Sequence, residues 1–95
     1  MTQQYLAGEL SVHLAELQAA TWNQAFACEI ACLRQQAEIA PITALARMAE
    51  RALELSDALC WDSLLCGDAA AFSRQAAIGA GLREFGICSC LLAEP

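Results

Sequence analysis

The amino-acid sequence predicts an all-α fold: a small bundle of three to four helices forming one helical domain over residues 1–95. Three observations predict it. Only two prolines and five glycines interrupt the chain, so long stretches can remain helical. Apolar residues recur at spacings of three, four and seven, the period of a helix buried on one side. Alanine, the strongest helix former, is abundant, and no β-hairpin pattern is present.

The first segment runs from about Gln3 to Ala40, with no breaker between Gly8 and Pro41. One apolar stripe follows nearly all of it: Tyr5, Val12, Ala15, Ala19, Trp22, Phe26, Ile30, Leu33, Ala37 and Ala40. A second stripe lies on another face: Leu6, Leu10, Leu14 and Leu17. The unbroken first stripe favours one long or gently kinked helix, extending roughly 57 Å. The alternative is a break near Ala20, because Thr21 and Gln24 have the spacing of a capping box.

A second helix is expected to follow Pro41, which fits a first helical position because its missing N–H is not needed there. This helix continues to about Cys66, where Gly67 ends it in the position after the C-cap. Its apolar stripe consists of Ile42, Leu45, Ala49, Ala52, Ser56, Leu59 and Cys60.

A last helix is expected after Asp68, which is a favourable N-cap residue. Gly79 and Gly81 lie within it, and they either end the helix or admit a close neighbour. The tail after Gly86 is either a final helical turn or irregular.

The charge balance excludes some partners. Five arginines, no lysine and eleven acidic residues give a formal net charge of −6. No basic face for phosphates can be assembled, so we expect no nucleic-acid partner and no binding to anionic membranes. No apolar run approaches the roughly 20 residues of a transmembrane helix. The absence of lysine beside abundant alanine is typical of a GC-rich bacterial genome.

Six cysteines are many for a chain of this length. The N-terminal residues lack the basic and apolar regions of a secretory signal, so we expect a cytoplasmic protein. Because the cysteines lie within helical patterns, we expect most of them to be reduced, buried thiols.

The histidine offers one candidate chemistry. Glu9, His13 and Glu16 share one side of the first helix, and a carboxylate–imidazole cluster can bind a metal or transfer a proton. Three ligands from one helix do not complete a coordination sphere. A solvent-exposed histidine is therefore the favoured interpretation.

A pair of cysteines offers a second candidate chemistry. Cys28 and Cys32 lie one turn apart, and two thiolates at that spacing can bind Cu(I) or zinc. They could join Cys88 and Cys90 if the tail folded back, but their small apolar neighbours favour simple packing. We therefore predict no cofactor and no metal, with Cys28, Cys32 and His13 as the candidate ligands.

Trp61 and Leu65 are placed unusually, close to the polar Glu50 and Glu54 side of their helix. They form either a contact surface or a patch that the last helix covers. Because the later helices cannot cover a 38-residue first helix, roughly 57 Å long, we predict a homodimer. Its interface candidates are Trp61, Leu65, Cys28 and Cys32.

No nucleophile elbow, P-loop or dinucleotide-binding motif is present. The sequence therefore favours a non-enzymatic helical interaction or accessory protein of a bacterial cytoplasm, acting as a homodimer or with a partner protein. The alternative is a small-ligand or soft-metal binding protein that uses Cys28 and Cys32 or the Glu9–His13–Glu16 cluster.

Overall fold

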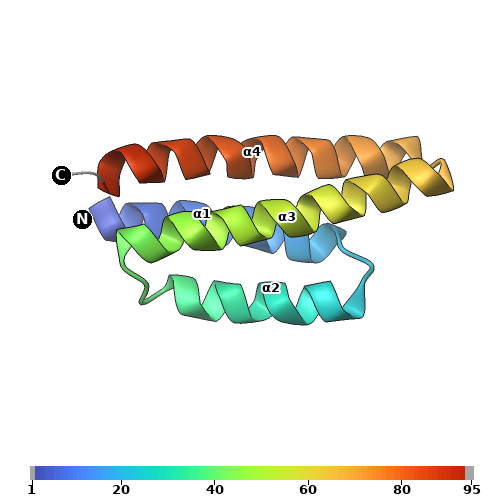
Figure 1. Cartoon of the computed structure of the whole chain (residues 1–95). Coiled ribbons are helices and arrows are strands. Elements are labelled where there is room, and N and C mark those ends of the chain that lie inside the picture. The colour runs from blue at the N-terminus through green and yellow to red at the C-terminus, as the bar shows by residue number, and fades with distance from the viewer. Residues whose placement is uncertain (1, 94–95) are drawn as a thin grey trace.

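A computed structural model describes the backbone of residues 2–93 and the side chains of residues 4–87. In this range the chain forms four helices and no strand: α1 (Thr2–Ala20), α2 (Gln24–Ala37), α3 (Ile42–Cys66) and α4 (Ala69–Ala93). The connections are short, so consecutive helices run antiparallel in an up-down-up-down bundle (Figure 1). The predicted all-α bundle is confirmed.

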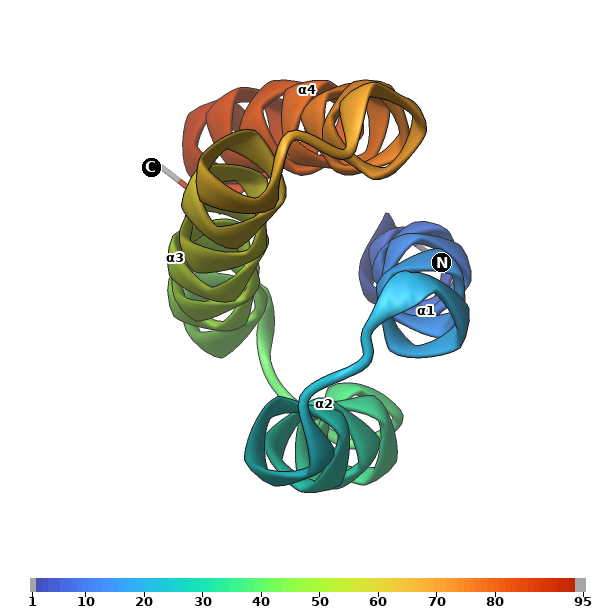
Figure 2. The ribbon, with the colours of Figure 1, turned by 90° about the vertical axis from the view of Figure 1, so that its right-hand side faces the viewer.

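The four helices occupy the corners of the bundle when it is viewed along its axis (Figure 2). Helix α1 packs beside α2 and α4, and α3 packs beside α2 and α4. The α3–α4 contact is by far the most extensive. On the diagonals, α1 also reaches α3, whereas the described parts of α2 and α4 do not touch.

The single long first helix is wrong, because the chain turns back at residues 21–23. Asn23 is extended (φ −92°, ψ 117°), and its Oδ1 accepts a hydrogen bond from the Phe26 N–H at 3.1 Å. This cap satisfies one of the free N–H groups at the start of α2. The predicted cap residue does not act here, since the Thr21 hydroxyl oxygen is buried without a hydrogen-bond partner.

The leucine stripe forms the core of α1. Leu6, Leu10, Leu14 and Leu17 are all buried, whereas Tyr5, Val12 and Trp22 of the other stripe are exposed. The other stripe predicts the buried face correctly only after the turn, where Ile30, Leu33, Ala37 and Ala40 are buried. Because the chain breaks at residues 21–23, each half turns its own face inward, and four leucines bury more apolar area than a stripe rich in alanine.

Helix α3 follows the predicted stripe closely. Its buried residues are Leu45, Met48, Ala49, Ala52, Leu55, Ser56, Leu59 and Ser63, while Ile42 and Cys60 are half-buried. Pro41 is the N-cap, one position earlier than predicted, and its carbonyl accepts hydrogen bonds from Ala44 and Leu45.

The turn between α3 and α4 is a Schellman motif. Gly67 has φ +76°, its N–H donates to the Leu64 carbonyl at 3.2 Å, and the Asp68 N–H donates to the Ser63 carbonyl at 2.9 Å. The Asp68 carboxylate then accepts from the Ala71 N–H at 3.0 Å and caps α4. The predicted roles of Gly67 and Asp68 are confirmed.

Helix α4 continues through both central glycines, which admit close neighbours. A Cβ at Gly79 would lie 3.3 Å from the Ser56 hydroxyl oxygen, and one at Gly81 would lie 2.9 Å from the His13 ring. The tail after Gly86 is helical to Ala93.

Candidate functional site

A buried polar contact marks the level at which α1 ends. The Gln75 amide of α4 is fully buried and donates to the carbonyl of Ala20, the last residue of α1, at 3.2 Å. The Ser56 hydroxyl of α3 donates to the Gln75 carbonyl at 3.1 Å. Past this level α3 and α4 continue as a two-helix hairpin that projects beyond the α1–α2 turn (Figure 1). We call residues 57–74 the hairpin tip.

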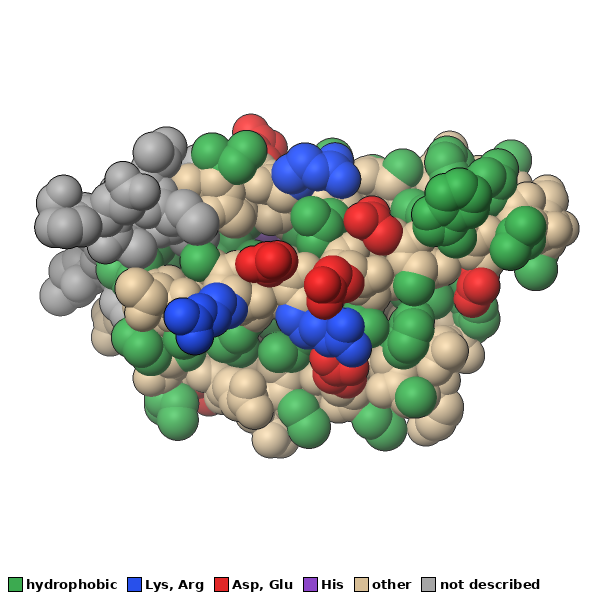
Figure 3. Space-filling view, in the orientation of Figure 1, with side chains coloured by type: hydrophobic (Ala, Val, Ile, Leu, Met, Phe, Trp, Pro, Cys, Tyr) green, Lys and Arg blue, Asp and Glu red, His purple; other side chains and the backbone are tan. Residues whose placement is uncertain are grey.

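Large apolar side chains are exposed together on the hairpin tip. Trp61 is 64% exposed, Leu65 80%, Leu64 56% and Phe72 39%. We call these four residues the tip surface, and apolar side chains gather over this end of the molecule (Figure 3). Leu64 and Phe72 also line a hollow of about 190 Å³, with Ser63, Gly67, Asp68 and Ala69. In other proteins, large exposed apolar patches are commonly found at interaction sites.

The structure bears on one of the two interpretations of Trp61 and Leu65, namely that the last helix covers them. Helix α4 packs against the face of α3 that carries Leu59 and Ser63, both buried, and leaves Trp61 and Leu65 uncovered. The alternative in which the last helix covers them is therefore wrong. Leu64 and Phe72 were not singled out from the sequence, because which faces of α3 and α4 are left exposed depends on how the two helices pack against each other.

The hairpin tip is held in one conformation by its own contacts. The Schellman turn and the Asp68 cap satisfy backbone groups at both helix ends. The Ser63 hydroxyl donates to the Leu59 carbonyl at 2.9 Å, and Leu59 and Ala71 are buried between the two helices. A surface that is already ordered loses little conformational entropy when a partner binds it.

The charges of the hairpin tip are negative except at its last residue, Arg74. Asp57, Asp62 and Asp68 lie in it, and the sequence has no arginine or lysine from residue 52 to residue 73. Within the described side chains, no ion pair involves any of the three aspartates. Burial and the neighbouring Asp57 carboxylate raise the pKa of the Cys60 thiol, which keeps that thiol protonated.

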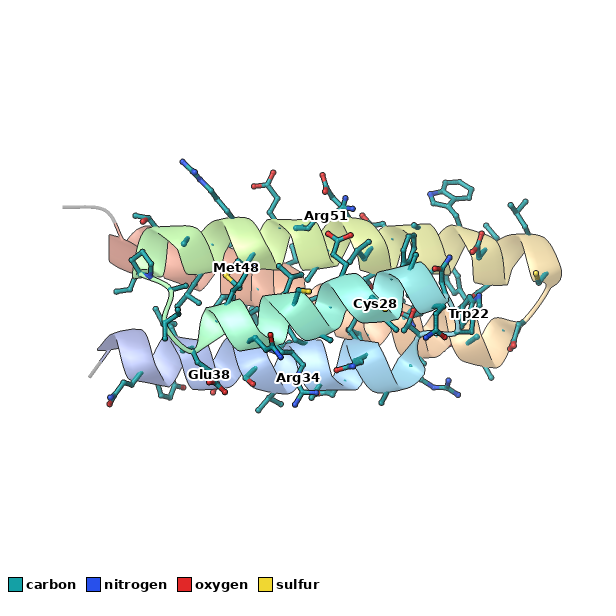
Figure 4. All side chains as sticks on the ribbon, turned by 90° about the horizontal axis from the view of Figure 1, so that it is seen from below. Trp22, Cys28, Arg34, Glu38, Met48 and Arg51 are labelled. Carbon is teal, nitrogen blue, oxygen red and sulfur yellow. The ribbon has the colours of Figure 1, made fainter. Side chains whose placement is uncertain are left out.

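The middle of α3 carries charges that are paired. Arg51 donates to both carboxylate oxygens of Glu29 on α2, at 2.5 and 3.0 Å, and to Glu54 at 3.0 Å (Figure 4). The hydrogen bonds from Arg51 and its charge lower the pKa of Glu29. The hydrogen bonds to Glu29 and Glu54 and the charges of these carboxylates raise the pKa of Arg51. Helix α2 is tied to α1 in a similar way, by a 2.8 Å hydrogen bond from Arg34 to Gln18.

His13 is half-buried, so the prediction of a solvent-exposed histidine is wrong. Its ring lies against the bare backbone of Gly81 and meets the ring of Phe85 edge-on, with centroids 6.2 Å apart. It borders a groove of about 300 Å³ between α1 and α4, which we call the histidine groove. The groove is lined by Tyr5, Leu6, Glu9, His13, Gly81, Glu84 and Phe85.

The predicted Glu9–His13–Glu16 cluster is divided between two hollows. Glu9 borders the histidine groove, whereas Glu16 lines a separate hollow of about 460 Å³ together with Arg74. The contribution of α4 to the histidine groove was missed, although a glycine inside a predicted helix is a signal of close approach.

The prediction of buried cysteines is wrong for Cys28, Cys32 and Cys66, which are exposed, and Cys60 is half-buried. Ile30, Leu33 and Ala37 occupy the inner face of α2, so Cys28 and Cys32 are left on its outer face. Figure 4 shows Cys28 from that side.

The described side chains that were predicted to bind a soft metal do not all lie close together. Among the described side chains, no three His, Cys, Asp or Glu residues lie close enough together to hold a metal ion. Helix α4 runs on to Ala93 without folding back toward α2, as the four-thiolate arrangement required. The side chains of Cys88 and Cys90 lie outside those that the structure describes.

Comparison of the chain with protein-family models, with curated proteins and with solved structures finds no match. Within residues 2–93, no helix has both the length and the apolar character needed to cross a membrane. The tip surface and the histidine groove are therefore the two candidate functional sites of this chain.

Proposed function

We propose that this chain is a non-enzymatic helical interaction or accessory protein that binds a protein partner through the tip surface. One observation carries the proposal: Trp61, Leu64, Leu65 and Phe72 are exposed together on a hairpin that projects from the bundle. Burying such side chains in an interface is strongly favourable, and tryptophan is enriched among the residues that dominate binding energy.

A second copy of the chain remains a proposed occupant, with Trp61, Leu65, Cys28 and Cys32 as interface candidates. The length argument for a homodimer no longer applies, because α1 is shorter than predicted and is flanked by α2 and α4. Light scattering tests the dimer, since a clean 10.1 kDa species at micromolar concentration would contradict it. The proposed setting in a bacterial cytoplasm rests on composition alone.

Site-specific photo-crosslinking tests the interaction proposal. The protein is expressed in the cells that naturally produce it, with a photo-reactive amino acid in place of Leu65. A matched variant carries it at Ile39, which is 87% exposed and lies at the opposite end of the bundle. We expect a reproducible adduct of defined mass from position 65 and none from position 39. Equal crosslinking from both positions, or none from position 65, would overturn the proposal.

A small-ligand site in the histidine groove is a second candidate function. The observation that favours it is the notch at Gly81, which lets the His13 ring lie against α4 beside Glu9 and Glu84. Two carboxylates together with Tyr5 and Phe85 suit a small organic cation, because carboxylates and aromatic faces both attract positive charge.

Titration with putrescine tests the groove, with the His13 ring resonances followed by NMR. We expect saturable shifts that are weakened in Glu9→Gln and in Glu84→Gln. Gln4→Ala, at an exposed position of the same helix, is the matched control. Shifts that do not saturate, or that persist in the two glutamate variants, would refute a specific cation site.

A further inference from the structure

We infer that the tip surface binds a basic amphipathic helix of another protein. This inference rests on the proposed interaction function and names the chemistry of its partner. It is drawn from the charges around the tip surface, from the shape of the apolar patch, and from the poor fit of a second copy.

The charge around the tip surface indicates the sign of the partner's charge. Asp57 and Asp62 of α3 and Asp68 of the turn carry the only formal charges between residues 55 and 73. The described structure gives none of them an ion pair, and the nearest arginine of α3, Arg51, is already bound to Glu29 and Glu54. Arginine or lysine residues that flank an apolar segment would meet these carboxylates and steer its approach.

The shape of the patch selects a helix. Trp61 and Leu65 lie one turn apart on α3, and Leu64, between them in sequence, lines the 190 Å³ hollow together with Phe72. Apolar side chains at positions i, i+3 or i+4, and i+7 of a partner helix lie along one side of it at a matching spacing. One such side chain can enter the hollow while its neighbours contact Trp61 and Leu65.

A second copy fits the tip surface less well. In a symmetric dimer the same patch meets itself, so the three aspartates of one copy would face the three of the other. The single arginine of the hairpin tip, Arg74, lies at its end and lines the separate hollow with Glu16. Anionic membranes are disfavoured by the same charge.

The test is a phage-displayed library of short helical peptides, randomised along one face and at the flanking positions. It is selected on the wild-type chain and counter-selected on a Trp61→Ala/Leu65→Ala variant. We expect enriched peptides with an apolar face and with arginine or lysine on its flanks.

Affinities are then measured on the enriched peptides with chains that contain Trp22→Phe, so that Trp61 is the only tryptophan and reports binding by fluorescence. We expect Asp57→Asn and Asp62→Asn each to weaken binding about two- to fivefold at low salt. Leu65→Ala weakens it by at least about tenfold. Glu38→Gln and Ile39→Ala, exposed at the far end of the bundle, are the matched controls and leave it unchanged.

The outcomes separate the inference from the proposed function. Enriched peptides without a basic bias, or aspartate variants that bind unchanged, would overturn the basic partner and leave the interaction function standing. Self-association that disappears in Trp61→Ala would identify a second copy as the occupant. A blue shift of Trp61 only with phosphatidylcholine vesicles would identify a lipid surface. No enrichment that depends on Trp61 and Leu65 would overturn both proposals.

Discussion

The two helical hairpins of this bundle are built differently. Helices α3 and α4 have 25 residues each, pack along their length and meet in a turn whose helix ends are capped by backbone and side-chain hydrogen bonds. Helices α1 and α2 have 19 and 14 residues and meet in an extended connection that buries an unpaired hydroxyl oxygen of Thr21. On α2 only Ile30, Leu33 and Ala37 are buried.

This difference separates two tasks. The α3–α4 hairpin holds the densest packing and, beyond the end of α1, presents the tip surface. The α1–α2 hairpin covers the rest of the core, and α2 is further tied to its neighbours by exposed polar pairs whose contribution to stability is small. Four sets of substitutions test this division, in decreasing order of their expected effect on stability.

The largest effect is expected in the core of the α3–α4 hairpin. Leu59→Ala should lower the free energy of unfolding by about 2–5 kcal/mol, because Leu59 is fully buried between two long helices that cannot close the cavity. Leu33→Ala, the matched change on α2, should lie at the low end of that range, since the lightly attached α2 can shift inward. Urea denaturation measures both, and an equal or larger loss for Leu33→Ala would contradict the comparison.

A smaller effect is expected where the two hairpins are joined by Gln75. Gln75→Ala should destabilise the chain by about 1–3 kcal/mol, because it leaves the half-buried Ala20 carbonyl without its donor. Amide hydrogen exchange should also quicken in the last turn of α1. Gln36→Ala, at an exposed position of α2, serves as the control and should change neither measurement. Unchanged exchange in α1 would show that Gln75 does not hold the two hairpins together.

Of the two polar residues in the connection between α1 and α2, we expect Asn23 to stabilise the fold and Thr21 not to. Asn23→Ala should cost about 1 kcal/mol, because it removes the cap of α2. Thr21→Val should be neutral or stabilising, because it replaces an unpaired buried hydroxyl with a methyl group. Thermal unfolding compares the two variants. The reverse order would mean that Thr21 is the cap that its capping-box spacing suggests.

The smallest effect is expected at the ion pair between α2 and α3. The pKa of Glu29 is lowered by Arg51, so the stability it contributes is present above the ordinary glutamate pKa and is lost as the pH falls through the lowered value. The stability difference between wild type and Glu29→Gln should therefore shrink in acid and in high salt. Denaturation at several pH values measures it. Glu38→Gln is the control, and a difference independent of pH would contradict the pairing.

Much of the fold could be predicted from local patterns. The span of α3, the Gly67 turn and the Asp68 cap follow from spacing and backbone conformation, which depend on residues close together in sequence. The position of the break between α1 and α2 could not be predicted in this way, because two apolar stripes competed and alanine-rich flanks support a helix through either. Which face of α1 lies inward depends on the other helices of the bundle, against which its leucines are buried.

The candidate sites were predictable only in part. Trp61 and Leu65 stood out because their position on α3 disagrees with its apolar stripe. Leu64 and Phe72 join them because the turn at Gly67 brings α3 and α4 side by side, which no local spacing reveals. Similarly, His13 was identified by its spacing to Glu9, but Gly81 and Phe85, which determine its surroundings, are far from it in sequence.

Thr2 and Ala93 lie at the same end of the bundle, opposite the hairpin tip (Figure 1). The longest dimension of the Cα trace is 44 Å. A sensor chip, a dye or a fused domain attached at either terminus would therefore stand at the far end of a rigid spacer. Trp61 and its neighbours would point away from the anchor, free to meet whatever approaches from solution.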